Sequence, residues 1–144
     1  MMTQLEGNWT LAEWDCTLDD AYHNHPFGKD AQGTIMYANG RMCAFLMKPD
    51  RPNFAIANLI RSSDEERLTA VSGFVSYSGS YRVEGDQVIH SVEFSLLPNW
   101  IGTELIRTIS WTNDDMPQLI LSTPPEKTSS GKNVVNRLRW QRLL

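Results

Sequence analysis

The feature that most constrains the fold of this chain is a repeated pairing of alternating segments across short turns. Residues 33–47 and 77–96 each alternate apolar and polar side chains. Each segment also holds a two-residue turn signal, Asn39-Gly40 in the first and Gly85-Asp86 in the second. Such pairs are typical of tight hairpins, whose central residues need a positive φ. We therefore expect two antiparallel hairpins here.

The same pattern continues along the rest of the chain. We expect a first strand at 7–16, a third hairpin from 102–111 and 117–123, and a last strand at 133–143. Eight strands joined by short turns form a meander, and a meander of this size can close into a barrel without exposed edges. The predicted fold is therefore all-β: an eight-stranded antiparallel up-and-down barrel in a single domain, residues 1–144.

The segment between the first two hairpins breaks this rhythm. Ser62 or Ser63 can cap a helix there, with acidic residues 64–66 in its first turn, where the helix dipole favours them. The sequence predicts one helix from about 63 to 74 and a shorter turn near 53–59. One or two short helices should thus lie between the third and fourth strands.

Composition and charge exclude several classes of function. The 144 residues carry a net charge of −4 and no long basic run, which argues against nucleic-acid binding. Neither a signal segment nor a membrane-length apolar run occurs. Cys16 and Cys43 form no disulfide framework, so a cytoplasmic protein with free thiols is expected. A possible homodimer is left open.

No cofactor is expected, because the sequence has no phosphate-binding loop and no nicotinamide or flavin fingerprint. His23 and His25 form an H-x-H pair in the segment after the first strand. A metal site there would need a further, distant ligand, so no metal is predicted. Contact of His25 with a ligand, as part of a lid loop, is the alternative to plain exposure to solvent.

The register of the second hairpin predicts which side chains point into the barrel. With Gly85-Asp86 at the turn, Tyr81 lies opposite His90 and Tyr77 lies opposite Phe94. This face is otherwise apolar and should point inward. A buried histidine is often only a hydrogen-bonded core residue, and this alternative stays open.

The following strand carries a second inward polar residue. Leu105, Ile109 and Trp111 share a face with Arg107, so Arg107 should also point inward. A buried guanidinium needs a carboxylate, a tyrosine or a polar ligand as partner, or else seals one end of the barrel. Glu93 is the nearest acid, but the register places it outside, where Arg82 is a candidate partner.

These residues belong to motifs that resemble a known family. Gly7-Asn8-Trp9 matches the G-x-W that opens the first strand of lipocalins, and the rest resembles the short lipocalin-like domain family of bacteria and fungi. The shared motifs are a Y-x-x-G-x-Y segment, an H-x-V-E strand and a P-N-W-x-G-T turn that leads to an arginine. The matching residues are Tyr37, Gly40, Arg41, Pro52, Tyr77, Tyr81, His90, Val92, Glu93, Pro98, Asn99, Trp100, Gly102, Thr103 and Arg107.

The resemblance implies a barrel with a central pocket, and some lipocalin-like proteins of secondary-metabolite pathways act as cyclases or isomerases. We expect a mid-sized, largely apolar metabolite and cofactor-independent isomerisation or cyclisation, with His90 and Tyr81 moving a proton and Arg107 polarising a carbonyl. The alternatives are a non-catalytic binding or carrier protein and a packed barrel that binds another protein. The expected ligand contacts are Trp14, Tyr37, Phe45, Tyr77, Phe94, Trp100 and His25.

Overall fold

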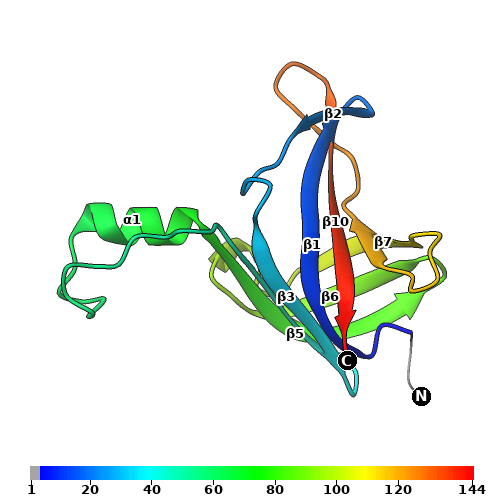
Figure 1. Cartoon of the computed structure of the whole chain (residues 1–144), viewed down its shortest axis with the longest axis horizontal. Coiled ribbons are helices and arrows are strands. Elements are labelled where there is room, and N and C mark those ends of the chain that lie inside the picture. The colour runs from blue at the N-terminus through cyan, green and yellow to red at the C-terminus, as the bar shows by residue number, and fades with distance from the viewer. Residues whose placement is uncertain (1–3) are drawn as a thin grey trace.

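The computed structural model describes residues 4–144 and has a closed, antiparallel β-barrel (Figure 1). Neighbouring strands follow the order β2-β1-β3-β4-β5-β6-β7-β8-β10-β9, and β1 also pairs with β10, which closes the sheet. The eight-stranded barrel expected from the sequence is confirmed, with β2 and β9 as short additions. The strands are β1 (Gly7–Leu18), β2 (Ala21–Asn24), β3 (Gln32–Ala38), β4 (Arg41–Met47), β5 (Phe74–Glu84), β6 (Gln87–Ser95), β7 (Glu104–Trp111), β8 (Leu119–Ser122), β9 (Glu126–Lys127) and β10 (Asn133–Leu143).

Both predicted two-residue turns are present. Ala38 pairs with Arg41 across Asn39-Gly40, whose φ angles are 52° and 78°. Glu84 pairs with Gln87 across Gly85-Asp86. The short turns fix the register of both hairpins, and with it the face on which each side chain lies.

The register of the β5–β6 hairpin matches the prediction only near its turn. Tyr81 lies opposite His90 as expected, but the register shifts between Ser78 and Gly79, and Phe94 lies opposite Ser78 instead of Tyr77. A β-bulge of this kind inserts one extra residue and reverses the facing of those beyond it. Phe94 is consequently 66% exposed on the outer surface, and its predicted inward orientation is wrong.

Glycine is required at the bulge because the opposite strand comes unusually close. A Cβ on Gly79 would lie 1.9 Å from the Ser91 carbonyl oxygen. The strand cannot accommodate a side chain there without moving backbone. Gly79 therefore allows the bulge that turns the end of β6 outward.

Phe45 also lies on the outside, contrary to prediction. Its neighbours Ala44 and Leu46 in β4 are buried at 4% and 9% exposure, whereas Phe45 is 36% exposed and packs against Phe74. Alternation along the strand explains the result, since only every second side chain can face the barrel interior.

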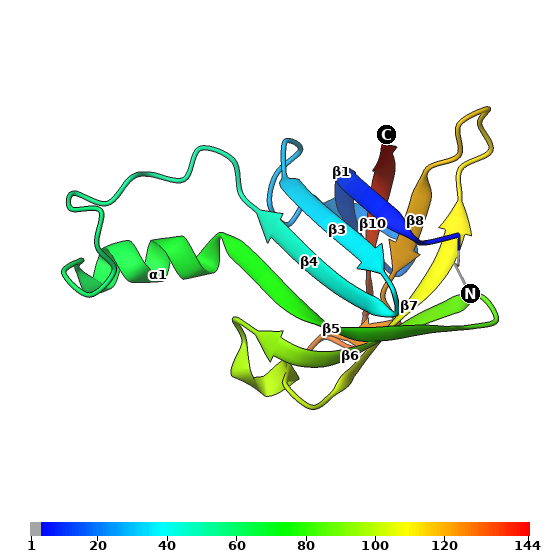
Figure 2. The same cartoon turned by 90° about the horizontal axis from the view of Figure 1, so that it is seen from below.

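A helical arm projects from the barrel between β4 and β5 (Figure 1; Figure 2). Helix α1 (Asp64–Ser72) begins at the predicted cap, where the Ser63 side chain accepts from the Glu66 amide and the Glu66 side chain accepts from the Ser63 amide. None of the helix residues is buried. The segment before α1 has bends at 55–57 and a turn at 60–61. No helix within residues 4–144 is long and apolar enough to cross a membrane.

One end of the barrel is closed by aromatic packing. Trp9 is fully buried and donates its indole N–H to the Leu5 carbonyl at 2.9 Å. The Arg142 guanidinium lies 4.1 Å from the centre of its ring, and Trp111 packs beside it. The P-N-W segment of the family motif forms the 3₁₀ turn η1 (Pro98–Trp100), which lies between β6 and β7.

We expect Gly79→Ala to destabilise the protein by about 3 kcal/mol, because the new methyl group would overlap backbone. Thermal unfolding should show a lower Tm by about 10 °C. Gly73→Ala is the matched control, since its Cβ would meet only the Lys48 side chain at 3.5 Å. Equal Tm values for the two variants would contradict this account of the bulge.

Candidate functional site

The barrel encloses a cavity of about 280 Å³ at the end opposite Trp9. Most of its wall is apolar, with a few polar groups, as is usual for sites that bind small molecules. Nine strands and the turn η1 contribute to it, so the site depends on closure of the barrel. The lining residues are Trp14, Ile35, Ala44, Leu46, Val75, Tyr77, His90, Trp100, Arg107, Leu121, Thr123, Glu126, Asn136, Leu138 and Trp140.

His90 lies at the base of this cavity between two tyrosines. Its Nε2 is 2.7 Å from the Tyr37 hydroxyl, and its Nδ1 is 2.9 Å from the Tyr77 hydroxyl. His90 has no exposed surface, and both tyrosines are buried. The three side chains come from β6, β3 and β5 and link these strands through the barrel interior.

Burial keeps all three of these groups neutral. It lowers the pKa of His90 to about 3, with a smaller contribution from the positive charge of Arg107. Burial also raises the pKa of Tyr37 and of Tyr77 above the usual value for a phenol. The base of the cavity is thus uncharged at neutral pH.

Tyr81, predicted to be the partner of His90, has a different role in the structure. It lies opposite His90 in the strand register, but its hydroxyl donates to Glu6 at 3.2 Å. Its ring packs on Tyr37 at 4.7 Å between centroids, and it does not line the cavity. The groups that contact His90 are Tyr37 and Tyr77, because hydrogen bonding through the barrel interior is not restricted to cross-strand neighbours.

Arg107 lines the cavity, as the strand pattern predicts. Its Nη1 donates to the Ile106 carbonyl at 2.9 Å, and it forms no ion pair within residues 4–144. Its positive charge acts on His90 and on the hydroxyl groups of Tyr37 and Tyr77. A guanidinium in this position can donate hydrogen bonds to a polar group of a ligand.

Glu93 lies outside the barrel, as predicted, but its partner differs from the expected one. Its carboxylate pairs with Arg41. Arg82, the expected partner, instead pairs with Glu84 at 2.9 Å and Glu104 at 2.7 Å. Glu93 therefore does not neutralise Arg107.

Three of the predicted aromatic contacts, Trp14, Tyr77 and Trp100, form part of the cavity wall. Trp14 lines it and donates its indole N–H to Asn136 Oδ1 at 2.9 Å. Trp100 packs edge-on against Tyr77, with ring centroids 5.6 Å apart. Tyr37 lies behind the wall and reaches the site only through His90. Phe45 and Phe94, on the outer surface, do not contribute.

His25 is also outside the cavity, contrary to the prediction of a ligand contact. Its ring is bonded to Glu13 and Tyr22, each at 2.9 Å, and Glu13 also pairs with Arg139. The hydrogen bonds from His25 and Arg139 lower the pKa of Glu13, and the one from His25 has the larger effect. Phe27, two residues after His25, packs on the cavity residue Trp14, with ring centroids 4.7 Å apart.

Residues 4–144 contain no cluster of His, Cys, Asp or Glu suited to a metal ion.

Several polar cavity residues were missed in the sequence. Asn136 alternates with Leu138 and Trp140 in β10, so it is a polar residue on an inward face, and this pattern could have revealed it. Thr123 lies in the segment after β8 and Glu126 in the two-residue strand β9, which is too short for alternation to give information. The Trp140 Nε1 is buried and has no hydrogen-bond partner within the described residues.

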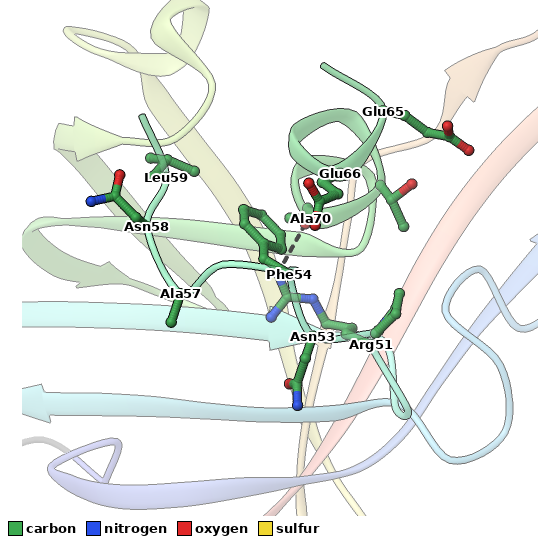
Figure 3. Close-up of a pocket in the computed structure, with 11 residues that line it drawn as sticks. Arg51, Asn53, Phe54, Ala57, Asn58, Leu59, Glu65, Glu66 and Ala70 are labelled. Atoms are coloured by element: carbon green, nitrogen blue, oxygen red, sulfur yellow. Dashed lines mark hydrogen bonds between the residues drawn. The ribbon is translucent and has the colours of Figure 1, made fainter. Parts of the chain in front are cut away.

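A second, larger hollow of about 860 Å³ lies outside the barrel, between residues 51–59 and α1 (Figure 3). Arg51 crosses it to donate to the Ala70 carbonyl at 3.1 Å, and Glu66 accepts from the Ala55 amide at 2.8 Å. Most residues around it are exposed. It lacks the buried, converging polar groups of the barrel cavity, which is therefore the better candidate site.

The buried neutral histidine predicts an acid-sensitive fold. Since the pKa of His90 falls from 6.5 when unfolded to about 3 when folded, the unfolded chain binds the extra proton and stability declines as pH drops below 6.5. From pH 6.5 to pH 4, wild type should lose about 3 kcal/mol more unfolding free energy than His90→Gln. Urea titrations at several pH values measure this difference. Parallel profiles for the two proteins would contradict a neutral buried His90.

Comparison with known proteins agrees with the motifs and the barrel. The lipocalin-like domain family matches residues 6–143. A protein of Aspergillus oryzae named 4'-hydroxy-3'-methoxypropiophenone carrier protein is 32% identical over 110 residues, which cover 71% of this chain and 96% of that protein. The chain belongs to the lipocalin-like domain family.

Proposed function

We propose that this protein binds and carries a small, largely apolar aromatic metabolite in its barrel cavity without converting it. The observation that carries this proposal is the cavity itself, which combines apolar walls with a few buried polar groups. Trp14 and Trp100 offer flat surfaces against which an aromatic ring can pack. The relative from Aspergillus oryzae, a carrier protein for an aromatic ketone by name, supports the same class of ligand.

The isomerase or cyclase activity expected from the sequence has less support. A general base needs an available nitrogen and a pKa near the working pH. Both ring nitrogens of His90 are engaged by tyrosine hydroxyls, and its pKa is about 3. Neither the family nor the relative's name adds evidence for turnover. In our proposal, Arg107 helps to orient the ligand, and neither His90 nor Arg107 moves a proton.

We expect 4'-hydroxy-3'-methoxypropiophenone to bind one molecule per chain, with a Kd on the order of 10 μM, in isothermal titration calorimetry. Ala44→Phe should weaken binding at least about tenfold, because Ala44 lines the cavity and the larger ring would occupy it. Chromatography of the incubated compound should recover it unchanged.

Ala38→Phe provides the matched control, since Ala38 is exposed next to the β3–β4 turn and the same substitution there should leave the Kd unchanged. Thermal unfolding of both variants checks that each is folded. A product formed by the wild-type protein and absent with His90→Gln would show that the protein is an enzyme and would contradict the carrier function. Lack of binding to the wild-type protein would contradict the proposed ligand class.

A further inference from the structure

The two hydrogen bonds of His90 can run in only two arrangements. A neutral imidazole has one N–H and one nitrogen lone pair, so it donates to one tyrosine and accepts from the other. In the first arrangement, Tyr37 donates to Nε2 and Nδ1–H donates to Tyr77. In the second, Tyr77 donates to Nδ1 and Nε2–H donates to Tyr37. The arrangements differ in which tyrosine accepts from His90 and so has a hydroxyl hydrogen that is not bonded to the imidazole.

The surroundings of Tyr37 decide between them. Tyr37 is 1% exposed, does not line the cavity, and has His90 as its one hydrogen-bond partner within residues 4–144. In the second arrangement, its hydroxyl hydrogen would be buried without an acceptor, which is costly. In the first, the hydrogen left over is that of Tyr77, which forms part of the cavity wall. The first arrangement therefore leaves no donor stranded in the core.

We infer that Tyr37 and His90 orient the Tyr77 hydroxyl as a hydrogen-bond donor into the cavity, and that the cavity recognises its ligand through a carbonyl oxygen. Rigid placement of the donor follows from the two hydrogen bonds behind it. This inference deepens the proposed function and rests on it for the identity of the site. It adds the chemical group that the site selects and names Tyr77 as the residue that selects it.

Other cavity groups also favour an acceptor on the ligand. The Trp140 Nε1–H is buried and unpaired among the described residues, and Trp140 lines the cavity. Asn136 uses its Oδ1 to accept from Trp14, which leaves its amide hydrogens as the available group. Arg107 adds further donors. The polar part of the wall is thus rich in donors, with the exposed Glu126 as an acceptor near the mouth.

The direction of the hydrogen bonds can be tested without any ligand. In protein labelled with ¹⁵N-histidine, two-bond ¹H–¹⁵N correlations at pH 7 identify which ring nitrogen carries the proton. We expect the Nδ1–H form for His90, with the signals of His23 and His25 assigned from His23→Gln and His25→Gln. An Nε2–H form, or a protonated ring, would overturn the inferred orientation.

The carbonyl preference can be tested with a matched pair of compounds. 4'-Hydroxy-3'-methoxypropiophenone and 2-methoxy-4-propylphenol differ in that a methylene group replaces the carbonyl. Wild type should bind the ketone at least about tenfold more tightly than the methylene compound, because the latter leaves the donor of Tyr77 unpaired. Tyr77→Phe should bring the ratio of the two Kd values close to one.

Tyr22→Phe is the control, since Tyr22 is 62% exposed and bonds to His25 outside the cavity, so the ratio should stay at the wild-type value. Equal affinities of wild type for both compounds, or an unchanged ratio in Tyr77→Phe, would overturn the inference while leaving a carrier function intact. If neither compound binds, the proposed function fails for this ligand class, and the histidine tautomer still decides the direction of the hydrogen bonds.

Discussion

The interaction on which the interior of this barrel depends is the pair of hydrogen bonds that holds His90 between Tyr37 and Tyr77. An imidazole without exposed surface is tolerated only where its polar atoms are paired, and here both nitrogens are. Because the three residues lie on β6, β3 and β5, the bonds connect these strands through the barrel interior. They also separate the barrel into a packed end and an end that holds a cavity.

The packed end and the cavity end are built by different means. At the packed end, large side chains fill the interior: Trp9 is fully buried, and Arg142 covers its ring. At the cavity end, the wall includes smaller residues such as Ala44. An eight-stranded barrel is just wide enough for side chains to fill it or for one small ligand to occupy it, so the choice of side chain decides between the two.

Alternation and turn chemistry predicted the barrel and the inward position of His90, because a two-residue turn fixes which side chains of a hairpin share a face. Alternation along the next strand predicted the inward position of Arg107. The serine and the acidic residues after it predicted the capped helix. The same reasoning failed for Phe94, since a β-bulge reverses facing and leaves only a weak mark in the sequence, a glycine on the opposite strand. The register of the hairpin also predicted Tyr81 as the partner of His90, whereas the structure has Tyr37. Contacts through the barrel interior depend on the twist of the sheet and on side-chain length, and the alternation pattern of a single strand encodes neither. His25 was misplaced because its position is set by bonds to the outer wall.

The low pKa of His90 has a consequence for what the cavity can do. General acid-base catalysis requires a group that changes its protonation state near the working pH. The hydrogen bonds of His90 instead hold its ring in one neutral form, and burial places its titration far below neutral pH. Such a site presents the same donors to a ligand before, during and after binding. A fixed pattern of donors fits the proposed carrier function, in which the site holds one compound selectively and releases it unchanged.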